Sequence, residues 1–113
     1  MTDEPRVFTY EEAQATLPRV RQLTVGAVRQ VDAIYQTLNA EDPEARRDEI
    51  EAAVQVIVAQ WSERVRALGC EVKGLWLVDW DNGDGYFCWR WPEESIAHCH
   101  GYEEGFAGRV PIH

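Results

Sequence analysis

The sequence LWLVDWDNGDGYFCWRW, residues 75–91, decides the fold, because it reads as two β-strands joined by a tight turn. Residues 72–80 and 85–91 alternate in polarity and are rich in aromatic and β-branched side chains, which favours strands. Asn82-Gly83 lies between them, and Asn-Gly is a strong hairpin signal because both turn residues must reach positive φ. The predicted pairs across this antiparallel hairpin are Trp80 with Gly85, Asp79 with Tyr86, Leu77 with Cys88, and Leu75 with Arg90.

This register sorts the side chains onto two unlike faces, because successive residues of a strand point to opposite sides. One face is an apolar wall suited to cover helices, made of Trp76, Val78, Trp80, Phe87, Trp89 and Trp91. The other face is mixed and holds nearly every reactive group of the hairpin: Lys73, Leu75, Leu77, Asp79, Tyr86, Cys88 and Arg90. We therefore expect any functional site to lie on the mixed face.

Residues 95–100 predict a short third strand, with Ile96, His98 and His100 on one side and Ala97 and Cys99 on the other. The last segment, GYEEGFAGRVPIH at 101–113, is a loop punctuated by glycines. Its apolar residues near the end indicate that the tail packs down onto the sheet.

The preceding part of the chain, about residues 9–68, predicts an antiparallel helical hairpin. Thr9 and Glu12 have the spacing of a capping box, and Pro18 predicts a kink or break in the first helical arm. Apolar residues then recur at alternating intervals of three and four, with Thr24 as the one polar member: Leu17, Val20, Thr24, Ala27, Val31, Ile34 and Leu38.

Residues 39–43, NAEDP, break that pattern and supply a cap at Asp42 and a first helical residue at Pro43. The second helix is predicted from about 43 to 68, with Gly69 at its left-handed C-cap. The chain is thus predicted to be a single α+β domain, residues 1–113, in which a long antiparallel helical hairpin packs on a small three-stranded antiparallel sheet. An isolated helix pair buries little on its outer side, so we also expect a homodimer.

The chain carries 20 acidic and 11 basic residues, for a formal net charge of −9. This acidic balance disfavours a nucleic-acid backbone or an anionic membrane as a partner. No apolar run approaches the roughly 20 residues that cross a bilayer, and residues 1–10 lack the pattern of a secretory signal. The three cysteines form no CxxC pair, and their odd number indicates reduced thiols. We expect a cytoplasmic protein.

Four segments carry a resemblance to a known family: FTYEEAQATLPRVRQL at 8–23, GLWLVDW at 74–80, YFCWRW at 86–91, and the run from Ile96 through His100 to GFAGRVPI. Over nearly its whole length the chain resembles a group of small bacterial and archaeal proteins, domain of unknown function 2203. The family usually reads VDFP where this chain has residues 78–81, and WHE where it has residues 99–101. The resemblance implies no activity, but it implies recurring positions at Asp79, Cys88, Trp89, His100, Gly105, Gly108 and Arg109.

A divalent metal is one candidate ligand of the mixed face. His98 and His100 have the spacing that places both imidazoles on one side of a strand, and Asp79 supplies a carboxylate. Zinc takes three or four such donors, and Cys88, Glu103 or Glu104 offer further ones. The three residues predicted as metal ligands are His98, His100 and Asp79.

Three other roles remain open at the level of sequence. Cys88 is a candidate nucleophile if His100 or Arg90 stabilises its thiolate. The loop Gly105-Phe106-Ala107-Gly108-Arg109 offers backbone N–H groups beside a guanidinium, which suits a carboxylate or a phosphate. Alternatively Arg109 pairs with Asp79 or Glu104, or a buried Asp–His link forms, and the tail is pinned to the sheet.

Two hypotheses of function follow. The first is a cytoplasmic binding or assembly module whose mixed face and GFAGR loop hold a small anionic ligand or a protein segment. Its predicted ligand-binding residues are Arg109, Asp79, His100, Cys88, Tyr86 and Arg90. The second is a small metal-dependent enzyme of hydrolytic type, with His98, His100 and Asp79 as metal ligands and Arg109 holding an anion. The sequence does not decide whether the protein is an enzyme.

Overall fold

The computed structural model describes residues 6–37 and 46–112. Helix α1 spans Tyr10–Gln36 and helix α2 spans Arg47–Arg66. The remaining elements are β1 (Glu71–Gly74), β2 (Leu77–Asp81), β3 (Tyr86–Arg90), β4 (His98–His100), the 3₁₀ helix η2 (Phe106–Gly108) and β5 (Val110–Pro111). The strands form one antiparallel sheet in the order β1-β2-β3-β4-β5. The predicted α+β class is confirmed, but the sheet has five strands where three were predicted.

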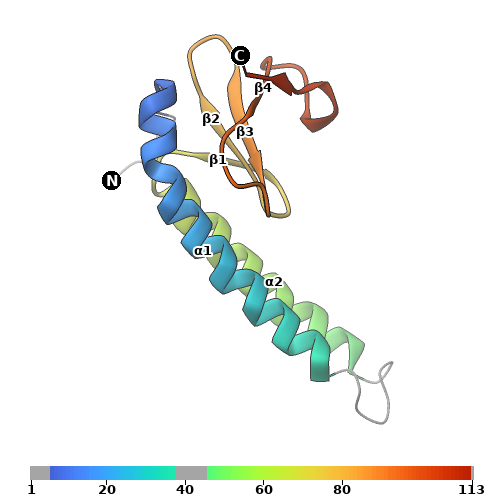
Figure 1. Cartoon of the computed structure of the whole chain (residues 1–113). Coiled ribbons are helices and arrows are strands. Elements are labelled where there is room, and N and C mark those ends of the chain that lie inside the picture. The colour runs from blue at the N-terminus through green and yellow to red at the C-terminus, as the bar shows by residue number, and fades with distance from the viewer. Residues whose placement is uncertain (1–5, 38–45, 113) are drawn as a thin grey trace.

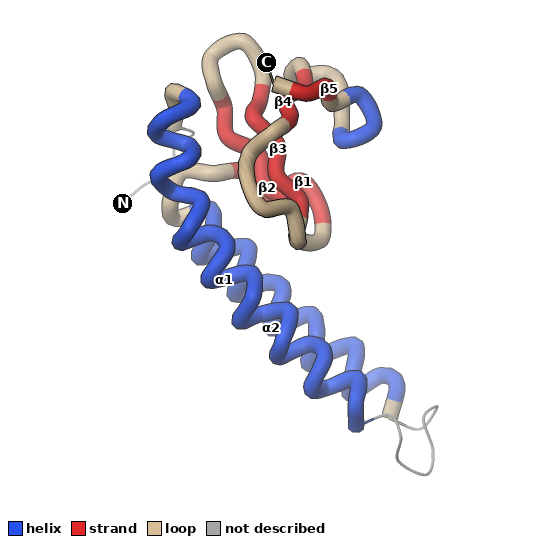
Figure 2. The backbone as a smooth tube through the Cα atoms, in the orientation of Figure 1, coloured by secondary structure: helices blue, strands red, loops and turns tan. Residues whose placement is uncertain are grey.

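The two helices lie side by side as an antiparallel hairpin, and the sheet packs at the end that holds the start of α1 and the end of α2 (Figure 1). The other end of the hairpin extends away from the sheet, as the helical segments in Figure 2 also show. No helix within the described ranges is long and apolar enough to cross a membrane.

Helix α1 begins as the sequence predicts. The Thr9 hydroxyl accepts a hydrogen bond from the Glu12 amide at 3.1 Å, and the Glu12 carboxylate accepts one from the Thr9 amide at 2.9 Å, so the capping box is complete. The helix continues through Pro18, so the predicted long helical arm is confirmed and, of the kink or break predicted at this residue, the break is wrong. Its buried face consists of Ala13, Leu17, Val20, Thr24 and Ala27.

Helix α2 ends at Arg66, two residues before the predicted limit. Gly69 follows with φ of 95°, the left-handed conformation expected after a helix. The predicted interruption between the two helices at 39–43, including the cap at Asp42 and the helix start at Pro43, lies outside the described residues.

The predicted strand at 72–80 is in fact two strands. Trp76 has φ of 58°, which turns the chain between β1 and β2, and this is a rare conformation for an aromatic residue. Its indole packs edge-on against Trp61 of α2, with ring centroids 4.9 Å apart. We attribute the turn to this contact, because burial of two indoles offsets the backbone strain.

The register of the β2–β3 hairpin differs from the predicted one by two residues. The ladder ends at Asp81 and Tyr86, and the loop Asn82–Gly85 is closed by a hydrogen bond from the Asn82 amide to the Gly85 carbonyl oxygen at 2.9 Å. A shift of two leaves the side chains of β2 and β3 on their predicted faces, whereas Leu75, predicted on the mixed face, lies in the turn between β1 and β2. The observed pairs are Leu77 with Arg90, Val78 with Trp89, Asp79 with Cys88, Trp80 with Phe87, and Asp81 with Tyr86.

The apolar wall predicted for one face of the hairpin is confirmed. Val78, Trp80 and Trp89 have no exposed surface and belong to the core, and the partly buried Trp76, Phe87 and Trp91 pack against it. Two indole N–H groups find threonine acceptors on α1: Trp61 donates to Thr24, and Trp80 donates to Thr16, each at 2.8 Å. These bonds satisfy polar atoms that burial would otherwise leave without partners.

The third predicted strand and the tail both contribute to the sheet. β4 is shorter than predicted, because the chain from Ser95 to Ala97 is not strand and Ile96 turns into the core. Cys99 pairs with Val110, so the tail packs down as expected and also adds the two-residue strand β5. The tail therefore lies along β4, next to the mixed face.

Replacement of Thr24 by Val tests the packing of the hairpin. The change leaves the buried Trp61 N–H without an acceptor, so the free energy of unfolding is expected to fall by about 1–3 kcal/mol. Thr37→Val, at an exposed position after α1, serves as the control and should change stability by less than about 0.5 kcal/mol. Urea unfolding followed by tryptophan fluorescence measures both, and equal stability of the two variants would contradict the assignment.

Candidate functional site

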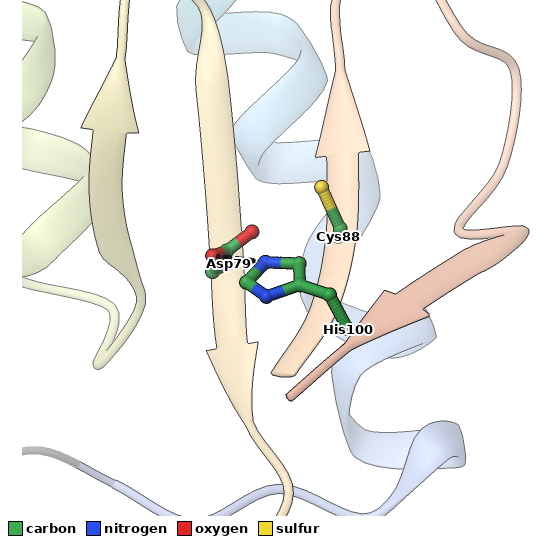
Figure 3. Close-up of side chains that lie close together, drawn as sticks. All are labelled: Asp79, Cys88 and His100. Carbon is green, nitrogen blue, oxygen red and sulfur yellow. Dashed lines mark hydrogen bonds and ion pairs between the residues drawn. The ribbon is translucent and has the colours of Figure 1, made fainter. Parts of the chain in front are cut away.

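Three side chains from three neighbouring strands meet on the mixed face. Asp79 of β2 lies opposite Cys88 of β3, and the His100 ring extends from β4 across β3 to the Asp79 carboxylate (Figure 3). One donor atom from each residue lies within 4.8 Å of the other two. All three residues are buried, with whole-residue exposures of 1% for Asp79, 0% for Cys88 and 8% for His100. We call these residues the Asp–Cys–His cluster.

Both ring nitrogens of His100 have partners. Nδ1 lies 2.8 Å from the Gly101 carbonyl oxygen, which only accepts, so Nδ1 carries a hydrogen and donates it. Nε2 lies 2.7 Å from Oδ2 of Asp79, so one further proton is shared between the ring and the carboxylate. The buried Asp–His link considered from the sequence is thereby present.

Burial dominates the electrostatics of the cluster. It raises the pKa of Asp79, and the nearby His100 and Cys88 oppose this rise only in part. It also raises the pKa of the Cys88 thiol to about 12, and the Asp79 carboxylate adds to this while the Arg109 guanidinium acts in the opposite direction. Oδ1 of Asp79 is buried without a hydrogen-bond partner among the described residues. This oxygen can therefore still accept a hydrogen bond or bind a cation.

Aromatic residues cover one side of the cluster. The Tyr86 ring lies 5.4 Å from the His100 ring and packs edge-on against Tyr102 at 5.2 Å. The Tyr102 hydroxyl donates to Asp81 at 2.7 Å, which ties the loop after β4 to the end of β2. The ammonium of Lys73 lies 4.3 Å from the centre of the Tyr86 ring. Tyr86 therefore lies beside the cluster.

Arg109 pins the C-terminal tail, but its partner is not one that the sequence suggested. It donates to both carboxylate oxygens of Glu93, at 2.6 Å and 3.0 Å, and its guanidinium lies 4.1 Å from the centre of the Phe106 ring. Pairing with Asp79 or Glu104 is therefore wrong. Glu104 instead lies close against Gly101 and Gly108, where added Cβ atoms would meet its carboxylate oxygens at 2.8 Å and 3.0 Å.

His98 is not part of the Asp–Cys–His cluster. It pairs with Cys88 in the β-ladder, but its Nδ1 lies 3.8 Å from Glu93 Oε2 and makes no hydrogen bond within the described chain. Of the three residues predicted as metal ligands, the structure brings Asp79 and His100 together with Cys88, and His98 lies apart from them. Glu93 was missed, because residues 92–95 read only as a turn and no spacing links Glu93 to Arg109.

Arg90 and Cys88, two further residues predicted to bind a ligand, differ in their surroundings. Arg90 is exposed, lies opposite Leu77 in the ladder, and its guanidinium is 5.2 Å from the centre of the Phe106 ring. Cys88 lies beside His100, but its raised pKa keeps the sulfur protonated at neutral pH. This geometry does not favour a nucleophilic thiolate in the absence of a bound cation.

The fold and the cluster define a small α+β protein with a buried Asp–Cys–His group on its sheet and a C-terminal tail that runs along β4 and is held by an ion pair. The family model described as "uncharacterized conserved protein (DUF2203)" matches residues 6–112, so the chain belongs to this family. No curated protein and no solved structure matches the chain.

The ion pair of Glu93 and Arg109 makes a pH-dependent contribution to stability. Burial alone would raise the pKa of Glu93, but hydrogen bonds from the Arg109 side chain and the Arg90 amide outweigh it, so the pKa lies below the ordinary value of 4.5. Since the folded pKa is lowered, the contribution is fully present above pH 4.5 and is lost as the pH falls through the folded value.

Glu93→Gln should therefore lower the free energy of unfolding at neutral pH by about 1–2 kcal/mol. The gap between variant and parent should shrink as the pH falls below 4.5. Glu94→Gln, at the exposed neighbouring position, is the matched control and should behave like the parent chain. A gap of constant size over this pH range would contradict the ion pair as its source.

Proposed function

We propose that this protein is a binding module built around a divalent metal ion of the zinc type, held by Asp79, Cys88 and His100. The observation that carries the proposal is the meeting of an oxygen, a sulfur and a nitrogen donor within 4.8 Å in a buried setting. Zinc accepts all three donor types, whereas magnesium and calcium prefer oxygen alone.

The hydrogen bonding of His100 supports this role. Metal-bound imidazoles almost always donate their second ring N–H to a carboxylate, a carbonyl or water, which fixes the tautomer and the ring orientation. In His100 the Gly101 carbonyl oxygen accepts this hydrogen bond from Nδ1, so Nε2 is the nitrogen that faces Asp79. A cation would take the place of the proton now shared between Nε2 and Oδ2.

The orphaned oxygen of Asp79 supports it further. Zinc in structural sites is almost always four-coordinate. If Asp79 bound through both oxygens, three side chains would supply four donor atoms, and the unpartnered Oδ1 would gain a partner. A bound cation would also offset the burial that keeps Cys88 protonated, because a coordinating thiol loses its proton.

The burial of the ligands favours an enclosed metal that holds β2, β3 and β4 together over a hydrolytic centre. A hydrolytic zinc site keeps one position open to water, whereas the side chains of Asp79 and His100 are only 1% and 4% exposed. An anion at Arg109 would have to displace Glu93, so the proposal does not include an anion clamp. We further propose that the helical hairpin and the sheet act as one domain, in the cytoplasm, where thiols stay reduced.

Metal content and thermal stability test the proposal. Protein purified without a histidine tag should contain, or take up, one equivalent of zinc, and cobalt should give a thiolate-to-metal charge-transfer absorption. At metal concentrations about a hundredfold above the dissociation constant, stability should rise by about 2.7 kcal/mol. Cys88→Ser should remove the charge-transfer band and most of the stabilisation.

Cys99→Ser is the matched control, because Cys99 is a free thiol of the neighbouring strand and lies outside the cluster. It should keep the cobalt absorption and the stabilisation of the parent chain. If no metal binds, or if Cys88→Ser and the parent respond alike, the proposed metal site does not exist.

A further inference from the structure

A groove of about 270 Å³ runs between α1 and α2, away from the Asp–Cys–His cluster. Leu23 and Ile57 line it and are only partly buried, although both pack against the core. Arg19 and Arg64 also line it, and no acidic side chain within the described ranges does. The groove is therefore a partly apolar surface with basic groups on a chain whose net charge is −9.

Gly26 lies in the middle of α1 and lines this groove. A Cβ at this position would meet no atom of the described chain within 4 Å, so no contact inside the chain requires glycine here. Glycine in a helix interior costs about 1 kcal/mol relative to alanine. A close approach by another backbone or side chain at Gly26 would account for this residue.

Helix α2 carries an acidic and a basic residue on its groove side, so two antiparallel copies of this side would be complementary in charge. Glu49 precedes Gln60 by eleven residues, about three helical turns, so both lie on the side of α2 that carries Arg64. Within residues 6–37 and 46–112, neither Glu49 nor Arg64 has an ionic partner. They are fifteen residues apart, about 22 Å along the helix.

A two-fold axis perpendicular to α2, midway between Glu49 and Arg64, passes close to Ile57. The axis also passes near Ala27, because Thr24 of α1 contacts Trp61 of α2 and so fixes the relative level of the two helices. A second hairpin related by this axis runs antiparallel to the first. Each Arg64 then meets Glu49 of the second copy. Gly26 and Ala27 of α1 lie near the axis, where the two backbones approach most closely.

We propose that a second copy of this chain occupies the groove, so that two hairpins pack antiparallel into a four-helix bundle with Arg64 and Glu49 paired twice across the interface. Such a contact is isologous and closes at two copies, because the same surface serves both partners. Burial of Leu23 and Ile57 supplies apolar area, and the two ion pairs fix the orientation and the register. This inference does not depend on the metal site.

A charge exchange tests the proposal with the full-length protein. The parent chain should sediment as a dimer at micromolar to millimolar concentrations. Arg64→Glu alone and Glu49→Arg alone each place like charges opposite one another at both ends of the interface. Each should weaken dimerisation at least about tenfold. The double variant Arg64→Glu/Glu49→Arg restores opposite charges and should recover the dimer.

Arg66→Glu is the matched control, since this exposed residue of α2 does not line the groove. It should leave the dissociation constant unchanged, and circular dichroism should show equal helix content in all variants. A second test replaces Gly26 by Leu, which should block close approach and weaken the dimer. A monomeric parent chain, or single and double charge variants that dimerise alike, would overturn the proposal.

Discussion

The hydrogen bond between His100 and Asp79 constrains the sheet more than any other single contact. His100 lies on β4 and Asp79 on β2, so the imidazole has to pass over β3, and both side chains are almost fully buried. A slip of one residue in β2 would place Val78 or Trp80 under the ring and bring the acid into the apolar core. Burial of such polar groups is unfavourable unless they are paired, so this contact selects one register for three strands.

Local patterns were enough to predict the helical hairpin, the β2–β3 hairpin and the two faces of the latter. Alternation assigns the indoles to one side, and this assignment survives an error of two residues in register because the side-chain period is two. The turn at Trp76 depends on its contact with Trp61, which lies on a helix, and no local signal reports it. Strand β5 is only two residues long and forms because β4 offers it a free edge.

The sequence predicts which face of the sheet carries the candidate site, but not all the residues that form it. Asp79, Cys88 and His100 follow from alternation together with the family resemblance, and the structure brings them together. His98 has the right spacing, yet its ring faces Glu93 on the preceding turn. The partner of Arg109 depends on where that turn brings Glu93, and contacts between loops carry no periodic signal. Sequence patterns therefore located the clustered side chains of the strands better than the ion pairs of the loops.

In the proposed metal site a divalent cation replaces the proton shared by His100 and Asp79, with the Cys88 sulfur as the third donor. X-ray absorption at the zinc edge of the metal-loaded protein tests this most directly. We expect one sulfur scatterer at about 2.3 Å together with nitrogen and oxygen scatterers at about 2.0–2.2 Å. A zinc environment of nitrogen and oxygen alone would contradict it, because the buried thiol would then take no part in holding the metal.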